Sequence, residues 1–130
     1  MTRRGFTLIE VLVCMALTAL LMALAVPSYR HSVLRSRRHE AQAALYRVQA
    51  LQERHYFDHA RYASSLQALG VAPTSDSHWY ALALHVGDDG QTWRLEAAAV
   101  GSQADDAECG ALTLDETQTR GSTGGERCWR

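Results

Sequence analysis

The sequence contains no lysine, and all 13 of its basic side chains are arginine. It also has only two prolines and three cysteines in 130 residues, and its formal net charge at pH 7 is -1. A chain of this length builds one small domain with a modest core, so there is no room for a second domain. The absence of lysine carries no functional message by itself.

The chain also lacks the residue patterns of common catalytic centres. No activated nucleophile with a base beside it can be argued from the sequence, and there is no glycine-rich phosphate loop. His55 and His59 have the i, i+4 spacing of helical zinc sites, but no third ligand is evident and so small a chain leaves little space for a substrate cleft. The acidic pairs at 88–89 and 105–106 lack the spacing of a calcium loop and are interpreted as turns. We therefore expect no catalytic residue, no metal, no cofactor and no enzymatic activity.

One long apolar run, residues 6–27, dominates the start of the chain. A helix rises about 1.5 Å per residue, so a run of about 20 residues covers the hydrocarbon core of a bilayer. The run holds one acid, Glu10, and no base. An ionisable group in such a segment costs several kcal/mol unless it is paired. Glu10 therefore either meets a cation from another molecule or lies in the first helical turns, where the helix dipole favours an anion.

The residues around Glu10 resemble the class III leader of type IV prepilins, in which a short basic leader precedes glycine, phenylalanine and, four residues later, glutamate. The matching residues here are Arg3, Arg4, Gly5, Phe6 and Glu10. The resemblance implies that a prepilin peptidase in the membrane cuts between Gly5 and Phe6 and methylates the new amine of Phe6. It also implies that Glu10 pairs with the Phe6 amine of a neighbouring subunit, which agrees with the cost of an unpaired buried charge.

Thr7 and Pro27 also match this family, and Pro27 is expected to bend the helix because it removes a donor and clashes with the preceding turn. On this basis residues 1–5 form a leader peptide and residues 6–27 a transmembrane and assembly helix. Residues 28–130 then form a periplasmic globular domain.

Two other interpretations of the N-terminal segment remain open. Residues 23–25, Ala-Leu-Ala, form a passable signal-peptidase site, which would release a soluble secreted protein. Residues 2–6 also resemble a twin-arginine signal. Against both, Glu10 interrupts the apolar region, which is longer than the 7 to 15 residues that are typical of a signal. The arginines that follow the segment would favour the opposite membrane orientation by the positive-inside rule, and here the leader motif is preferred.

After Ser28 the apolar residues become periodic, which indicates an amphipathic stem helix over about 28–58. The expected buried stripe consists of Ala41, Ala44, Leu45, Val48 and Leu51. Alternating apolar residues then predict strands at about 79–86, 92–100 and 111–117, and the first two form a hairpin around the turn at 87–90. The predicted fold is α+β: a long N-terminal helix packed on a small antiparallel β-meander, as in type IV pilins.

The three cysteines separate by position. Cys109 and Cys128 enclose the last stretch of the chain, and in an exported domain we expect them to form a disulfide. Cys14 lies in the apolar segment and is interpreted as a small apolar residue, with an intersubunit bridge as the lesser alternative. The C-terminal region from Cys109 to Trp129 resembles minor pilins of the PilE-like kind.

Charge is unevenly distributed along the chain. Residues 30–61 hold seven arginines against three acids, whereas residues 62–130 hold four arginines against ten acids. The basic stem and the acidic head either pair between subunits or face solvent separately.

The resemblance implies a minor pilin that enters a type IV pilus, acts in filament assembly or initiation, and so supports twitching motility and cell adhesion. Its implied partners are other pilin subunits, the prepilin peptidase and the pilus assembly machinery. It would lie in the inner membrane with a periplasmic head before assembly and in the extracellular pilus, or fimbrium, afterwards.

Two further functions remain as alternatives. One is a pseudopilin of a type II secretion system, which shares the leader and stem. The other is a pilin-like DNA-uptake receptor, a less favoured hypothesis in which stem arginines contact phosphates. The arginines considered for that contact are Arg30, Arg35, Arg37, Arg38, Arg47, Arg54 and Arg61.

Overall fold

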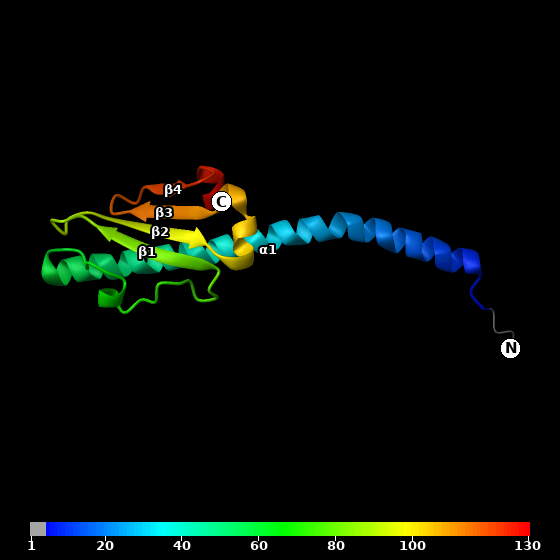
Figure 1. Ribbon diagram of the computed structural model, residues 1–130, viewed down its shortest axis with the longest axis horizontal. Helices are drawn as coiled ribbons and strands as arrows, with labels where there is room; N and C mark the ends of the chain where they lie inside the picture. Colours follow the sequence, from blue (N-terminus) through cyan, green and yellow to red (C-terminus); the bar gives the residue numbers. More distant parts are fainter. Residues whose placement is uncertain (1–4) are drawn as a thin grey trace. The chain divides into compact units, whose positions relative to one another are not determined.

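The computed structural model describes residues 5–130, which form one long helix, several short 3₁₀ turns and one antiparallel sheet (Figure 1). Arg3 and Arg4 of the expected leader lie outside the described residues. The chain divides into two compact units, one up to Val33 and one over residues 34–130. Helix α1, Leu8–His59, contributes residues to both units, which are described here separately.

In the first unit, helix α1 has no covering from its own chain. All described side chains from Gly5 to Ser32 are exposed in the subunit. The helix is long and apolar enough to cross a membrane, judged by length and composition, and none of its most apolar window is buried. A buried core helix of a soluble protein would be largely covered instead. An exposed apolar surface of this extent marks a segment that lipid or other protein covers.

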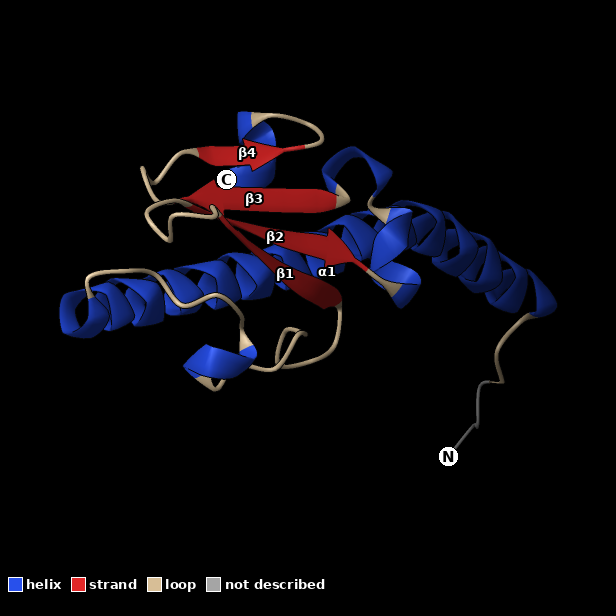
Figure 2. Cartoon of the chain, turned by 60° about the vertical axis from the view of Figure 1, so that its left-hand side comes forward, coloured by secondary structure: helices blue, strands red, loops and turns tan. Residues whose placement is uncertain are grey.

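In the second unit, residues 34–59 of α1 bury one face under a β-sheet (Figure 2). The buried helix residues are Ala41, Ala44, Leu45, Val48 and Gln52. Four of these belong to the expected stripe, whereas Leu51 is only half-buried and the polar Gln52 is completely buried. The stripe therefore continues through 41, 45, 48 and 52, which are three and four residues apart and lie on one side of a helix.

The sheet has four antiparallel strands in the order β1-β2-β3-β4. Strands β1 (Tyr80–Val86), β2 (Trp93–Ala99) and β3 (Ala111–Asp115) lie at or near the positions expected from the alternating pattern. Strand β4 (Arg120–Ser122) was not expected; it pairs with β3 at the edge of the sheet. The sheet therefore has one more strand than the sequence pattern predicted.

The core of this unit lies between the inner face of the sheet and the stem part of α1. Alternate residues of each strand point inward, because successive side chains of a strand face opposite sides. The fully or nearly fully buried strand residues are Tyr80, Leu82, Trp93, Leu95, Ala97, Leu112 and Leu114. In the register, Leu84 lies opposite Leu95 and Leu82 opposite Ala97, so the hairpin places its apolar residues on one face.

Gln52 joins the stem helix to the segment that follows it. Its Nε2 donates to the carbonyl oxygen of Ala63 at 3.0 Å, and its Oε1 accepts the backbone N–H of Ala63 at 2.8 Å. Ala63 is also buried, so neither of its backbone groups has access to water as a substitute. This pair of bonds explains why a polar residue occupies a position in the apolar stripe.

Replacing Gln52 with leucine is therefore expected to destabilise the head although it adds apolar surface. The substitution leaves a buried N–H and a buried C=O of Ala63 unpaired, which costs about 1–3 kcal/mol for each group. Chemical denaturation of the full chain in detergent, followed by tryptophan fluorescence, would measure the change. Gln49→Leu on the half-buried neighbouring position is the matched control and should change stability little. Equal stability of the two variants would contradict the structural role of Gln52.

Candidate functional site

The start of helix α1 forms a capping box between Thr7 and Glu10. The Glu10 backbone N–H donates to Thr7 Oγ1 at 3.3 Å, and Glu10 Oε2 accepts the Thr7 backbone N–H at 3.1 Å and the Thr7 hydroxyl at 3.2 Å. Such a pair satisfies backbone donors that the first turn of a helix leaves open. Glu10 therefore has a local structural role besides any role between subunits.

The capping box occupies only one carboxylate oxygen of Glu10. Among the described residues, the hydrogen bonds to its side chain all come from Thr7 and end on Oε2. A carboxylate has acceptor sites on both oxygens, so Oε1 can still accept from an external donor. The cap orients the acid and keeps it available for a cation.

An apolar groove of about 560 Å³ runs beside Glu10 along the first unit. Glu10, Cys14 and Thr18 lie on this groove at intervals of four residues, with Phe6 at one end and Met22 at the other. Thr18 donates its hydroxyl to the Cys14 carbonyl at 2.7 Å, so its polar group is satisfied within the helix. Cys14 is a free, exposed thiol. The groove thus presents one charge, that of Glu10, on an otherwise apolar surface.

In the second unit, several stem arginines are engaged by the head of the same chain. Arg47 forms a paired hydrogen bond with Asp76 at 3.1 and 2.9 Å, and hydrogen bonding from Arg47, together with its charge, holds the pKa of Asp76 below its ordinary value. Arg37 lies over the ring of Trp79, 3.6 Å from its centroid, and donates to Ser102. These contacts already occupy two of the arginines considered for DNA binding.

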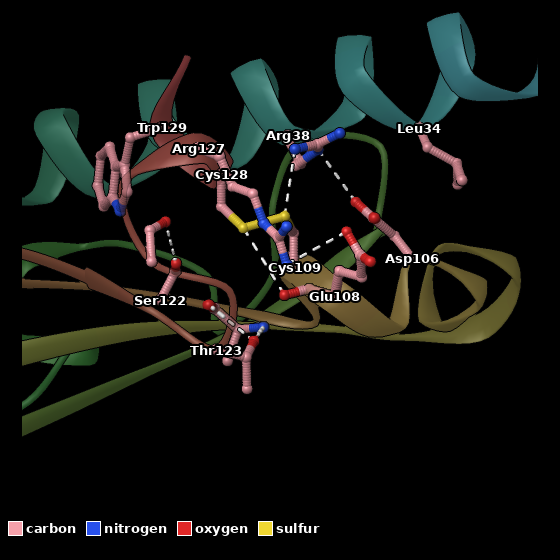
Figure 3. Close-up of a disulfide and its surroundings, with 12 residues drawn as sticks. Leu34, Arg38, Asp106, Glu108, Cys109, Ser122, Thr123, Arg127, Cys128 and Trp129 are labelled. Atoms are coloured by element: carbon pink, nitrogen blue, oxygen red, sulfur yellow. Dashed lines mark hydrogen bonds and ion pairs between the residues drawn. A yellow bond between two sulfur atoms is a disulfide. The ribbon is translucent and has the colours of Figure 1, made fainter.

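A third stem arginine, Arg38, lies beside the expected disulfide (Figure 3). Cys109 and Cys128 are bonded at 2.01 Å, and Arg38 Nη1 lies 3.2 Å from the Cys109 sulfur. Arg38 Nε also lies 3.0 Å from Asp106 Oδ2, and both side chains are largely buried. Charge pairing in a partly buried site is stronger than on the surface, and losing one partner would leave the other unpaired. The disulfide joins Cys128 to the segment before β3, and the Arg38 contacts with Asp106 and Cys109 attach that segment to the stem.

Gln103 extends this polar cluster into the core. Its Nε2 donates to the Tyr80 hydroxyl at 2.9 Å and to the Leu34 carbonyl at 3.2 Å. Burial raises the pKa of Tyr80, and the hydrogen bond from Gln103 opposes that rise. The sequence gives no signal for this cluster, because its members lie far apart in the chain and become neighbours only in the fold.

The C-terminal segment forms a small groove with exposed arginines, which we call the tail groove. It has a volume of about 320 Å³ and is lined by Gln118, Thr119, Arg120, Glu126, Trp129 and Arg130. The Arg120 guanidinium lies 5.8 Å from the centre of the Trp129 ring, and Trp129 Nε1 donates to the Gly121 carbonyl. Two cations beside a fixed aromatic ring suit a ligand with negative charge and a flat apolar part. The alternating pattern gives no indication of this groove, because β4, which supplies Arg120, is not predicted by it.

Comparison with protein families gives two matches, which together cover most of the chain. Residues 27–113 match the family described as type IV minor pilin ComP, DNA uptake sequence receptor. Residues 1–26 match the prokaryotic N-terminal methylation motif. The second match contains the residues expected from the leader, namely Gly5, Phe6, Thr7 and Glu10.

Comparison with individual proteins agrees with these matches. The chain is 30% identical over 86 residues to the type IV major pilin protein PilA of Myxococcus xanthus (strain DK1622), which covers 65% of this chain and 39% of PilA. The chain thus spans about two fifths of the length of that curated relative. A solved structure of a type IV pilin from Shewanella oneidensis superposes with a TM-score of 0.55 at 28% identity, covering 67% of this chain and 89% of that one. The expected α+β pilin-like fold is confirmed.

The disulfide generates a testable prediction. Replacing both Cys109 and Cys128 with serine should lower the free energy of unfolding by about 3 kcal/mol, because the closed loop no longer restricts the unfolded chain. Denaturant titration of the full chain in detergent, under oxidising conditions, would give the value. Cys14→Ser is the control and should leave stability unchanged, since this thiol is free and exposed. An unaltered unfolding midpoint in the double variant would show that the bridge does not stabilise the head.

Proposed function

The chain belongs to the type IV pilin family, with the domain of the ComP minor pilins, and we propose that it enters a type IV filament through residues 6–27. Proteins of this family are structural subunits and not enzymes, in agreement with the expectation from the sequence. The association with other pilins and with a prepilin peptidase follows from the same family and from the methylation motif.

In the proposed pathway the peptidase cleaves between Gly5 and Phe6 and methylates the amine of Phe6. Residues 6–27 then hold the subunit in the inner membrane, with the head in the periplasm, until the pilus assembly machinery transfers it to the fibre. Its role there is that of a minor subunit in assembly or initiation, which supports twitching motility and adhesion. The extracellular pilus is its final location.

The observation that carries this proposal is the uncovered apolar helix with one carboxylate. The exposed side chains along the first unit need lipid in the membrane state and neighbouring helices in the filament state. Transfer between these states favours a docking position in which a cation meets Glu10, because a wrong register leaves the charge unpaired. The free oxygen of Glu10 and the apolar groove beside it fit such a partner.

Two substitutions at Glu10 separate its charge from its capping role. Glu10→Gln keeps an acceptor for Thr7 and removes the charge, whereas Glu10→Ala removes both. If charge pairing drives assembly, both variants should remain stable in the membrane but be depleted from sheared filaments, by at least about tenfold for a lost pair worth about 1.4 kcal/mol or more. Quantitative immunoblots of filament and membrane fractions would measure this ratio.

Thr18→Ala is the matched control in the same groove, since it changes a polar residue without altering charge. It should enter filaments as the unmodified chain does. Normal incorporation of Glu10→Gln would contradict the charge-pairing mechanism, and a defect confined to Glu10→Ala would assign Glu10 to helix capping alone.

A second candidate function is DNA binding by the head, and the match to a family described as a DNA uptake sequence receptor favours it. The contacts within the chain argue against Arg37, Arg38 and Arg47 as the principal phosphate contacts. Arg120 and Arg130 of the tail groove are exposed, and Trp129 beside them offers an aromatic surface. Phosphate contacts of this kind provide affinity that falls as salt concentration rises.

Fluorescence anisotropy with a labelled duplex and the full chain in detergent tests this second function. The Arg120→Gln/Arg130→Gln variant should bind more weakly, and the slope of log affinity against log salt should fall by about one for each phosphate contact removed. Arg47→Gln serves as the control, because Arg47 already pairs with Asp76. Absence of binding at about 50 mM salt would exclude DNA as a ligand without affecting the filament proposal.

A further inference from the structure

Strand β1 forms one edge of the sheet, and only the first part of this edge is paired. The strand order leaves β1 with β2 as its one neighbouring strand (Figure 2). On the other side of β1, Thr74 forms an isolated antiparallel bridge with Ala81. The Leu82 N–H also donates to the Pro73 carbonyl oxygen at 2.8 Å. Pro73 has no N–H with which to bond the Leu82 carbonyl in return, so the pairing ends there.

Beyond Leu82, β1 presents backbone groups that have no partner. In an antiparallel strand, successive residues direct their N–H and C=O groups to opposite sides. Leu82 donates on the side away from β2, so Leu84 and Val86 direct their backbone groups to that side too. Within residues 5–130 neither the backbone nor a side chain bonds to these groups. The open groups are therefore the N–H of Leu84 and Val86 and the C=O of Leu82, Leu84 and Val86.

The open groups border a groove along the edge of the sheet, which we call the edge groove. It has a volume of about 690 Å³, and Leu82, Ala83 and Leu84 form one of its walls. The segment that precedes β1, residues 64–73, forms the other wall. Past Leu84 the edge continues along a second cavity of about 460 Å³, which Val86 lines. The unpaired part of the edge therefore faces accessible space and not another part of the head.

The chemistry of this edge fits an extended polypeptide. Its open donors and acceptors recur at every second residue, as the N–H and C=O groups of an adjacent strand do. Leu66, Val71 and Leu84 make the edge groove partly apolar, which suits an apolar side chain at every second position of such a strand. The wall formed by residues 64–73 leaves the edge accessible to a single chain, because the edge of a whole second sheet would meet that wall.

We propose that the edge of β1 from Leu82 to Val86 binds one extended segment of a partner polypeptide as a fifth, antiparallel strand. Antiparallel addition continues the direction of the segment already paired with β1 and lets the partner exchange hydrogen bonds with all the open groups. The N-terminal end of the partner segment then lies beside the β1–β2 turn. Asp88 and Asp89 are exposed there and outnumber the nearby Arg61, so a basic residue fits at that end. This inference does not depend on the filament or DNA proposals.

A synthetic peptide, acetyl-Arg-Val-Thr-Val-Thr-Val-Ser with a C-terminal fluorophore, serves as the probe for the full chain in detergent. Fluorescence anisotropy should show saturable binding with a Kd below about 1 mM. Hydrogen exchange followed by NMR identifies the groups involved. In the free chain the amides of Leu84 and Val86 should exchange fast, whereas those of Ala83 and His85, which face β2, should exchange slowly. Saturating probe should slow exchange at Leu84 and Val86 by at least about tenfold.

N-methylation of the probe separates backbone pairing from general apolar binding. Methyl groups on the three valine amides, which face β1 when the valine side chains lie on the apolar side of the groove, should weaken binding by at least about tenfold. Methyl groups on the two threonine amides, which face away from β1, should change affinity by less than about threefold. A probe with glutamate in place of arginine should bind at least about threefold more weakly, and equal binding would overturn the antiparallel placement.

A pair of matched variants tests the groove from the side of the protein. Ala72→Phe places a large ring in the edge groove and should weaken probe binding by at least about tenfold. Ala104→Phe, at an exposed alanine that lines neither cavity, is the control and should bind as the parent does. Circular dichroism would verify that both variants keep their fold.

Four results would overturn the proposal. They are absence of saturable binding at about 1 mM probe, equal effects of the two methylation patterns, slow exchange of the Leu84 and Val86 amides in the dilute free chain, and unchanged exchange of these amides with bound probe. Protection of the same amides that rises with protein concentration in the absence of probe would identify a second copy of the chain as the occupant, and would also overturn it.

Discussion

One helix supplies both the surface that the head covers and the surface that it leaves uncovered. Over residues 34–59, α1 buries the face formed by Ala41, Leu45, Val48 and Gln52 against its own sheet. Up to Ser32 the same helix has an apolar surface with no covering from its chain. Apolar area is stabilised only when it leaves water, so the first part of α1 requires lipid or protein from outside. The proposals for membrane anchoring and for filament assembly both depend on this division.

The capping box gives Glu10 a hydrogen-bond partner within its own subunit. Before any neighbour arrives, Glu10 already has Thr7 as a hydrogen-bond partner and lies near the positive end of the helix dipole. Both effects lower the cost of keeping a carboxylate in the membrane state. In the proposed filament a neighbouring amine would add a charge partner to an acid that is already oriented, so little side-chain ordering would remain to be done on docking.

The sequence predicted the helix, three of the strands and the disulfide because each has a local signal: an apolar run, a periodic pattern or a pair of cysteines. It did not predict β4, which is only three residues long and has glycine at its centre. Gly121 lies so close to Thr113 that an added Cβ would come within 2.5 Å of the hydroxyl oxygen. The requirement for glycine therefore comes from the neighbouring strand and cannot be recognised in the alternating pattern.

The residues of the candidate sites differ in the same way: some have a local signal in the sequence and others do not. The residues proposed for assembly, Thr7, Glu10 and Pro27, lie in or directly after one N-terminal segment that matches a motif, so the sequence alone could nominate them, and their role stays a prediction. The contacts of Arg38 with Asp106 and Cys109, and of Arg37 with Trp79, join residues that are distant in the chain. Periodicity placed Leu51 in the buried stripe, but in the structure Leu51 is half-buried and Gln52, which bonds to the backbone of Ala63, is completely buried. Such choices are set by tertiary packing and by the partners available to polar groups.

The disulfide between Cys109 and Cys128 can form only late in synthesis. Cys128 follows the last strand, β4, and its partner Cys109 lies just before β3. During synthesis the ring cannot close until residue 128 has been translated, so the helix and all four strands must emerge without this crosslink. A chain that lacks Cys128 therefore has a head whose β3 and β4 are not enclosed by a covalent ring.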